Sequence, residues 1–144
     1  MHVVDSLRQR ADREFVVFDA SSGVSLLDAV AASCAVPLVW PPVPINGTTY
    51  VDGGIRSPAN ADLAEGADVV VVLAPGTQTL SREHAIGRQL ERTGASRTLA
   101  VSPDSESLAE MGSNVLDPAH RKASALTGMR QGLTIASEVA EVWN

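Results

Sequence analysis

A run of hydrophobic, mostly β-branched residues is the feature that most limits the folds open to this chain. It reads Asp68-Val-Val-Val-Val-Leu-Ala-Pro75 and contains no alternation between apolar and polar residues. A strand with one face in water alternates, whereas a parallel strand covered on both faces is apolar throughout. The run therefore predicts a buried parallel strand with helices on both sides of its sheet.

The segments around this strand alternate between strand and helix. Continuous or alternating apolar residues predict strands, and apolar residues at helical spacing predict helices. We expect strands at 14–19, 43–45, 48–51, 68–75 and 97–101, and helices at 26–35, 57–65, 82–93 and 118–142. Alternation of this kind predicts an α/β fold, here a three-layer sandwich with a mixed or parallel sheet.

Local signals set several of these boundaries. Ser25 is placed to cap the first helix, with Asp28 in the capping-box position three residues later, and Pro37 prevents the helix from continuing. Its small apolar residues predict a helix buried on most sides. Asn46-Gly47 between two strand-like segments predicts a tight hairpin, because both residues tolerate a positive φ.

Composition excludes several classes of protein. The chain has 144 residues, 44% of them hydrophobic, which fits one folded domain. A net charge of −6 argues against nucleic acid as a partner, because phosphates require basic residues. No apolar run approaches the roughly 20 residues of a transmembrane helix, and the first residues do not resemble a secretory signal, so a cytoplasmic location is expected. Cys34 is the only cysteine, which excludes internal disulfides and zinc sites built on several thiolates.

The turn Asp52-Gly53-Gly54 is the strongest candidate for a functional site. It ends a short strand, and its two glycines let the chain turn tightly and let a ligand or another backbone approach. A carboxylate held there can act as a base, provided that a nucleophile lies opposite it. The alternative is an ordinary Asp-Gly turn in which Asp52 binds only its own backbone.

Several motifs together resemble the patatin-like phospholipases. The most specific are Ala32-Ser-Cys-Ala-Val-Pro37 at the end of the first helix and Tyr50-Val-Asp-Gly-Gly54. The resemblance extends from about Glu14 to Trp143 and includes Asn60-Ala-Asp-Leu-Ala64. It implies an acyl hydrolase of fatty-acyl esters or phospholipids that works through a Ser–Asp dyad and a covalent acyl-enzyme, with no metal and no other cofactor. Asp52 matches the aspartate of the dyad, and Gly53 and Gly54 match the turn that shapes the site.

The nucleophile that this family requires has no counterpart here. The family holds its serine in a Gly-x-Ser-x-Gly turn between a strand and a helix. No serine of this chain has that context; Gly94-Ala-Ser96 begins like it but continues with Arg97 and Thr98. We therefore expect residues 1–144 to be the C-terminal portion of a patatin-like domain, inactive alone and partnered by a complementary N-terminal fragment or by a second copy of itself. A non-catalytic, self-associating α/β module is the alternative, and the absence of a Gly-rich phosphate loop disfavours a nucleotide-binding domain.

The remaining candidates have simpler structural interpretations. Cys34 could be a nucleophile, but an Ala-rich helix predicts a core position for it. Arg56 beside Gly53-Gly54 could bind an anion, but a structural turn with a solvated arginine is favoured, because the chain has no Gly-x-Gly-x-x-Gly motif. Packing, capping or surface roles are favoured for His2, His84, His120, Trp40, Trp143 and the pair Asp117-Pro118.

Overall fold

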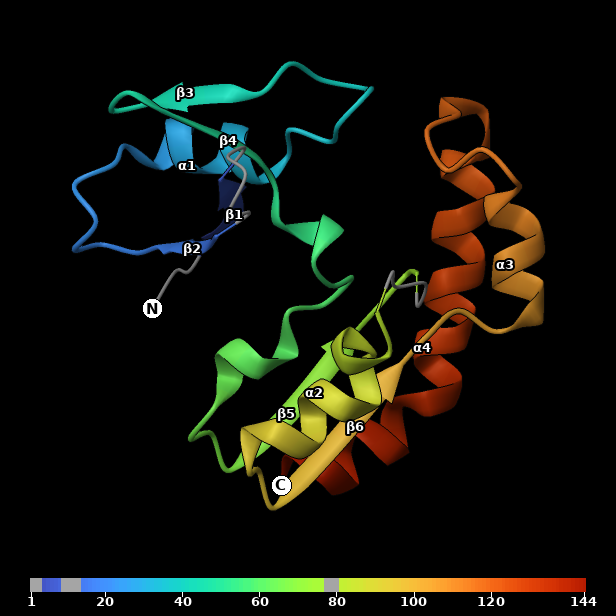
Figure 1. The fold of residues 1–144 in the computed structure, drawn as a ribbon. Coiled ribbons are helices and arrows are strands. Elements are labelled where there is room, and N and C mark those ends of the chain that lie inside the picture. Colours follow the sequence, from blue (N-terminus) through green and yellow to red (C-terminus); the bar gives the residue numbers. More distant parts are fainter. Residues whose placement is uncertain (1–3, 9–13, 77–80) are drawn as a thin grey trace. The chain divides into compact units, whose positions relative to one another are not determined.

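The computed structural model of this chain describes residues 4–8 as a strand and residues 14–76 and 81–144 with their side chains. The chain divides into two units (Figure 1). Unit 1 contains residues 1–60 and 78–85, and unit 2 contains residues 61–77 and 86–144. Strands and helices in both units give the α/β class that the sequence predicts.

Unit 1 is built on an antiparallel sheet of four strands in the order β2-β1-β4-β3. The strands are β1 (Val4–Arg8), β2 (Phe15–Phe18), β3 (Val43–Ile45) and β4 (Thr48–Asp52). The predicted hairpin is confirmed: Asn46 and Gly47, at φ values of 48° and 77°, join β3 to β4. Strand β1 lies between β2 and β4 and pairs Ser6 with Asp52, so the end of β4 is held by β1, whereas β3 pairs with β4 only up to Tyr50.

Helix α1 (Leu26–Ser33) packs against this sheet and forms the core of unit 1. Phe18 and Tyr50 meet edge to face with ring centroids 5.1 Å apart, and Ala29 and Ala32 of α1 are buried with them. Burying a large apolar side chain contributes about 1.5–3 kcal/mol, so this cluster is a main source of stability in unit 1. The prediction that the helix is buried on most sides is wrong, since Leu26 and Leu27 are exposed.

The ends of α1 show which local signals decide its length. Ser25 caps the helix as predicted, and its hydroxyl accepts from the N–H of Asp28 and donates to the Asp28 carboxylate. In a capping box the acidic side chain would reach the backbone N–H of the cap instead. The helix ends at Ser33, before Pro37, so the proline does not itself set the last turn.

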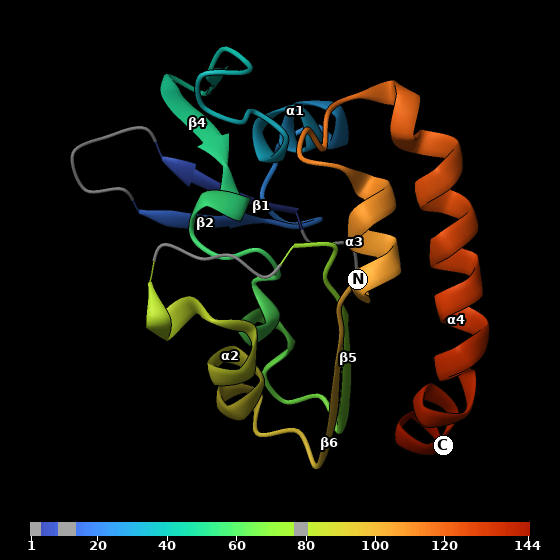
Figure 2. The same ribbon diagram turned by 90° about the vertical axis from the view of Figure 1, so that its right-hand side faces the viewer.

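Unit 2 contains two parallel strands with helices on both faces. Strand β5 (Val69–Leu73) pairs with β6 (Arg97–Val101), which confirms the predicted parallel strand. Helix α2 (Ile86–Thr93) and the 23-residue helix α4 (Arg121–Trp143) lie on opposite sides of this pair (Figures 1 and 2). Val70 and Val72 are buried and Val69 and Val71 half-buried, so one face of β5 is covered more fully than the other.

The described strands form two sheets, and together these contain both the parallel and the antiparallel pairings of the expected mixed or parallel sheet. The parallel strands have helices on both sides within unit 2, whereas the sheet of unit 1 is wholly antiparallel. A three-layer sandwich for the whole chain stays a prediction.

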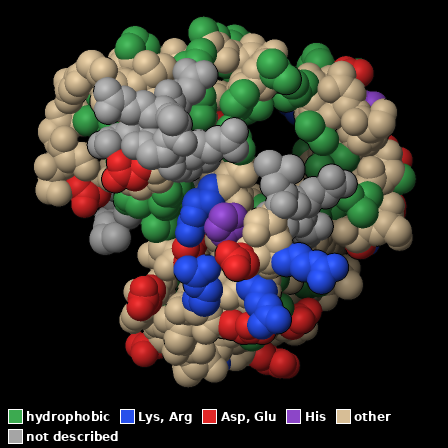
Figure 3. All heavy atoms as spheres, viewed as in Figure 1, with side chains coloured by type: hydrophobic (Ala, Val, Ile, Leu, Met, Phe, Trp, Pro, Cys, Tyr) green, Lys and Arg blue, Asp and Glu red, His purple; other side chains and the backbone are tan. Residues whose placement is uncertain are grey.

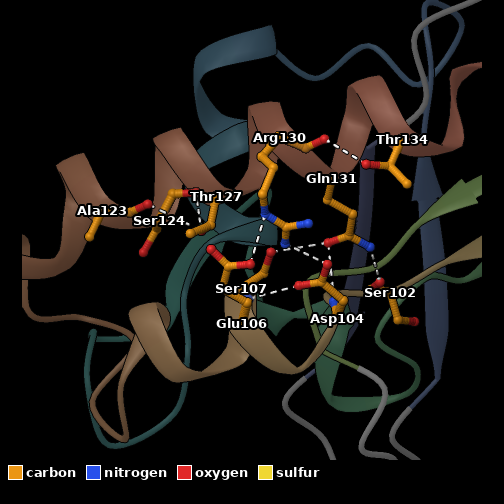
Figure 4. A network of polar contacts seen from close by, with 10 residues as sticks. All are labelled: Ser102, Asp104, Glu106, Ser107, Ala123, Ser124, Thr127, Arg130, Gln131 and Thr134. Carbon is orange, nitrogen blue, oxygen red and sulfur yellow. Dashed lines mark hydrogen bonds and ion pairs between the residues drawn. The ribbon is translucent and has the colours of Figure 1, made fainter.

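Two of the predicted helical segments differ from the structure, and one observed helix has no predicted counterpart. Within the expected helix 57–65 only the short 3₁₀ turn η2 (Ala61–Ala64) forms, directly after Asn60 at a φ of 43°; another 3₁₀ turn, η1 (Gly53–Ile55), precedes this segment. The expected helix 82–93 is interrupted at Ala85, which is extended and separates η3 (Arg82–His84) from α2. Helix α3 (Ser105–Met111) was not predicted; it packs against α4 through a polar network (Figure 4).

Helix α4 begins close to its predicted start. Asp117 accepts from the N–H of Ala119 at 2.9 Å and Pro118 follows it, as the sequence predicts, but the first turn, η4 (Pro118–His120), is 3₁₀. In the part of the chain that is described, no helix has the length and hydropathy needed to cross a membrane.

Candidate functional site

Asp52 is the last residue of β4 and is half-buried. Its backbone is held on two sides: it pairs with Ser6 of β1, and its N–H donates to the carbonyl of Ala35 at 3.1 Å. Ala35 lies just after α1, so this bond ties the end of β4 to the end of the helix. The sheet and α1 together fix the point from which the Asp52 side chain projects.

The Asp52 carboxylate is oriented by the turn that follows it. Its Oδ1 atom accepts from the backbone N–H of Gly54 at 2.6 Å, and no other donor in the described part of the chain lies within hydrogen-bonding distance of this carboxylate. A Cβ on residue 54 would lie 2.8 Å from the same oxygen, closer than real Cβ contacts come. Glycine at position 54 is therefore needed for this arrangement, and the neighbouring Gly53 is buried.

The geometry of Asp52 is compatible with both interpretations of the Asp-Gly turn, an ordinary backbone turn and a site for a base. The bond to Gly54 is the local backbone contact that an ordinary turn makes. It also anchors one carboxylate oxygen and thereby limits rotation of the carboxylate, while the second oxygen has the lone pairs that a base uses. An oriented, half-buried carboxylate of this kind can accept a proton from a hydroxyl brought next to it.

Arg56 is used in contacts within unit 1. Its guanidinium carbon lies 4.2 Å from the centroid of the Phe15 ring, a cation–π contact, and its Nη1 donates to Oδ1 of Asn60 at 2.7 Å. These contacts favour a structural role over the anion-binding role considered from the sequence.

Three residues that the sequence placed in packed positions are exposed, which corrects those predictions. Cys34 follows the last turn of α1 and is exposed; its sulfur lies 3.9 Å from the Ser33 hydroxyl. Trp40 and Trp143 were expected to pack, but they are 62% and 64% exposed.

The two described histidines belong to different units, His84 to unit 1 and His120 to unit 2. His120 lies beside the end of α3, where its Nδ1 is 2.8 Å from the carbonyl of Glu110, and His84 belongs to η3. His2 lies outside the described residues. No group of three or more His, Cys, Asp or Glu residues in the described ranges is placed to hold a metal ion. On the face shown in Figure 3, basic side chains lie among acidic ones and form no continuous stripe.

Two hollows belong to unit 2, at the carboxyl ends of its parallel strands, where α/β proteins commonly bind ligands. The larger, about 470 Å³, is bordered mainly by apolar side chains that include Met111, Val115 and Leu116. The smaller, about 310 Å³, lies between Pro75, Pro103 and the Gln131-Gly132 part of α4. Both hollows are lined by residues of unit 2, whereas Asp52 belongs to unit 1.

Asn60 is the residue near the turn whose role the sequence did not reveal. Sequence reasoning placed it inside a helix, whereas it is buried with a left-handed backbone and hydrogen-bonds to the turn that follows Asp52. Among residues other than glycine, asparagine is one of those that most readily adopt a left-handed backbone. The residue type at position 60 was therefore the sequence signal for a turn at this point.

Comparison with family models gives a match for the first part of the chain. Residues 2–65 match the family model described as patatin-like phospholipase, whereas no curated protein matches the chain. The matched stretch includes β1 to β4, helix α1 and the whole of the Asp52-Gly53-Gly54 turn. The expected resemblance beyond residue 65 stays a prediction. The match supports a relationship between this chain and the patatin-like phospholipases, a family of lipid hydrolases.

Proposed function

We propose that this chain supplies the catalytic aspartate of a patatin-like lipid acyl hydrolase. In this proposal Asp52 is the base of a Ser–Asp dyad, and Gly53 and Gly54 form the turn that shapes the site. The single observation that carries it is the carboxylate of half-buried Asp52, held at one oxygen by the Gly54 N–H within the segment that matches the family.

The chemistry is that of a serine esterase without histidine. The second oxygen of Asp52 takes the proton of the serine hydroxyl as that oxygen attacks the acyl carbon of a fatty-acyl ester or phospholipid. Asp52 then gives this proton to the departing alcohol, which leaves an acyl-enzyme. In the second half of the reaction Asp52 takes a proton from water as the water attacks the acyl-enzyme, and returns it to the serine.

The serine belongs to a different segment in this proposal. No serine of the chain stands in a Gly-x-Ser-x-Gly turn, and the resemblance puts that turn before the aspartate in the family's domain. Residues 1–144 then act as the C-terminal portion of the domain, and the 144-residue chain alone does not turn over substrate.

A non-catalytic, self-associating α/β module is the second candidate, favoured by exposed apolar side chains on α4. Leu126, Met129 and Leu133 are all more than half exposed and follow one another at helical spacing. Each strand of the β5–β6 pair also has one edge without a partner among the described strands, and open edges invite pairing. A second copy of the chain or a complementary N-terminal fragment would bury such surface.

Hydrolysis of p-nitrophenyl esters separates the two candidates. We expect no turnover by the 144-residue chain, and turnover when it is joined with its nucleophile-bearing segment. Asp52→Ala should then reduce kcat by at least about 10³-fold, because the serine loses its base. Asn46→Asp, on the exposed hairpin, is the control and should retain activity. Turnover by the chain alone, abolished by Asp52→Ala, would contradict the division of the dyad, and full activity of Asp52→Ala in the joined protein would contradict the hydrolase proposal.

A further inference from the structure

We infer that Asn60 is a positioning residue that holds the Asp52 carboxylate through the peptide group between Gly53 and Gly54. The inference rests on the proposed role of Asp52 as a base. Asn60 is 7% exposed, and its Nδ2 donates to the carbonyl oxygens of Gly53 and Ser57, each at 3.3 Å. It touches neither the carboxylate nor, in the proposal, the substrate.

The peptide group between Gly53 and Gly54 can transmit the restraint from Asn60 to Asp52 because it is rigid. The carbonyl of Gly53 and the N–H of Gly54 belong to one planar unit and point in opposite directions. Asn60 binds the carbonyl end of this unit, and Asp52 Oδ1 accepts from its N–H end at 2.6 Å. Rotation of the peptide plane would therefore break both bonds, so Asn60 fixes the direction of the N–H that orients Asp52.

Such restraint is needed because the peptide is flanked by two glycines. Glycine has the widest choice of φ and ψ, so this peptide plane is not held by its own residues. The bonds of Asn60 supply the missing constraint from outside the turn.

Asn60 is itself held firmly. Its Oδ1 accepts from Nη1 of Arg56 at 2.7 Å, and the Arg56 guanidinium lies over the Phe15 ring. Its backbone N–H donates to the Ser57 hydroxyl at 3.0 Å, and its φ is 43°. A line of contacts thus runs from Phe15 on β2 through Arg56 and Asn60 to the turn after Asp52.

Only a carboxamide fits the contacts around this side chain. It must donate to two carbonyls and accept from a guanidinium, and asparagine has both an amide NH₂ and a carbonyl oxygen. Aspartate keeps the acceptor for Arg56 but offers no donor to Gly53 and Ser57. Glycine keeps the left-handed backbone and removes the whole side chain. The two substitutions therefore separate the loss of the donors from backbone strain.

The Gly54 amide reports the positioning without any need for activity. NMR of the 144-residue chain should show faster hydrogen exchange of the Gly54 amide, by about tenfold, in both Asn60→Asp and Asn60→Gly, because its peptide plane is released. The matched controls are Asn46→Asp and Asn46→Gly. Asn46 is a second asparagine with a left-handed backbone, at the exposed hairpin turn, and these changes should leave Gly54 unaltered.

An unchanged Gly54 amide in a folded Asn60→Asp variant would overturn the inference. The amide chemical shifts of Tyr50 and Ala32 report whether unit 1 is folded. If the Asn60 variants do not fold, Arg56→Gln provides the second test, since it removes the guanidinium that holds Oδ1 of Asn60. It should accelerate Gly54 exchange in the same direction, and no change would again overturn the inference.

Kinetics of the protein that includes the nucleophile distinguish this inference from the function on which it rests. Asn60→Asp should reduce kcat by about 10²-fold with little change in KM, because a misplaced base impairs the transition state and not substrate binding. Activity lost in Asp52→Ala but kept in Asn60→Asp would overturn the positioning role alone. Activity kept in both variants would overturn the hydrolase proposal.

Discussion

Asp104 and Arg130 form an ion pair between residues far apart in sequence, which joins the start of α3 to the middle of α4 (Figure 4). Nη2 of Arg130 donates to Oδ2 of Asp104, while Oδ1 of Asp104 caps α3 by accepting from the N–H of Ser107. Nε of Arg130 lies 3.0 Å from the Glu106 carboxylate, as an ion-pair contact without hydrogen-bond alignment. One aspartate thus serves as both helix cap and cross-helix partner.

The ion pair predicts a loss of stability in acid. The hydrogen bond from Arg130, with that from Ser107, lowers the pKa of Asp104 to about 2 from its ordinary 3.8. Because the folded-state pKa lies below the unfolded one, the contribution is complete above about pH 4 and is lost as the pH falls towards 2. Urea unfolding of the 144-residue chain between pH 2 and pH 5 should show this decline.

Asp104→Asn is the matched variant for this pH effect. Asparagine caps helices as well as aspartate but does not titrate, so the variant should lose the part of the acid dependence that Asp104 causes. Glu91→Gln, which removes the exposed pair with Arg88, should leave the profile unchanged. Identical acid profiles for Asp104→Asn and the original protein would contradict the assignment.

Gln131 is the second link between α4 and the segment after β6. Its Nε2 donates to the carbonyl of Ser102 at 2.7 Å, and its Oε1 accepts from the N–H of Asp104 and the hydroxyl of Ser107, both at 3.1 Å. Replacing it with leucine should reduce the free energy of unfolding of unit 2 by about 1–3 kcal/mol, because partly buried polar groups lose their partners. Urea denaturation measures this, with exposed Glu138→Gln on the same helix as control. A change below about 0.5 kcal/mol would show that water replaces these bonds.

Gln89 has the same kind of role between α2 and η2. Its side chain is fully buried, Oε1 accepts from the N–H of Ala61 at 3.0 Å, and Nε2 donates to the Asp62 carboxylate at 3.1 Å. Gln89→Glu keeps the shape but brings a second carboxylate next to Asp62. It should destabilise unit 2 by more than about 2 kcal/mol near neutral pH and by less in acid, where the carboxylates are protonated.

The control for Gln89→Glu is Arg88→Gln, which changes the neighbouring residue on the exposed side of α2. It should change the free energy of unfolding little, because its contact with Glu91 is exposed. Equal effects of Gln89→Glu and Arg88→Gln would contradict the buried role of Gln89.

Strands were predicted better than helices, because strand signals in this chain are local. The run of valines at 69–72 and the Asn46-Gly47 turn specify β5 and the β3–β4 hairpin within a few residues. The helix expected at 57–65 does not form because Asn60 donates to the Ser57 hydroxyl and to the Gly53 carbonyl, and these contacts outweigh helix propensity. The sequence gives no signal for the break at Ala85, because neither this residue nor its two neighbours is a glycine or a proline.

The candidate site was predictable only in part for the same reason. Asp52 could be found because it belongs to the recognisable Asp-Gly-Gly motif, whereas the role of Asn60 depends on the direction of its side chain, which the sequence does not give. Helix α3 did carry local signals, with Asp104 before it and Gly112 after it at a φ of 71°, but a helix of seven residues gives little periodicity to detect.

Gly54→Ala tests the turn directly, because the added Cβ would lie 2.8 Å from Oδ1 of Asp52 and the carboxylate would have to move. We expect kcat of the protein that includes the nucleophile to fall by about 10²-fold, since small displacements of a reacting group have effects of this size. The control is Gly87→Ala in α2, where a Cβ meets nothing within 4 Å; alanine should stabilise that helix by about 0.5–1 kcal/mol and leave kcat unchanged. Normal kcat in Gly54→Ala would mean that catalysis does not depend on the observed position of the Asp52 carboxylate, and the aspartate would then have to act from a different rotamer.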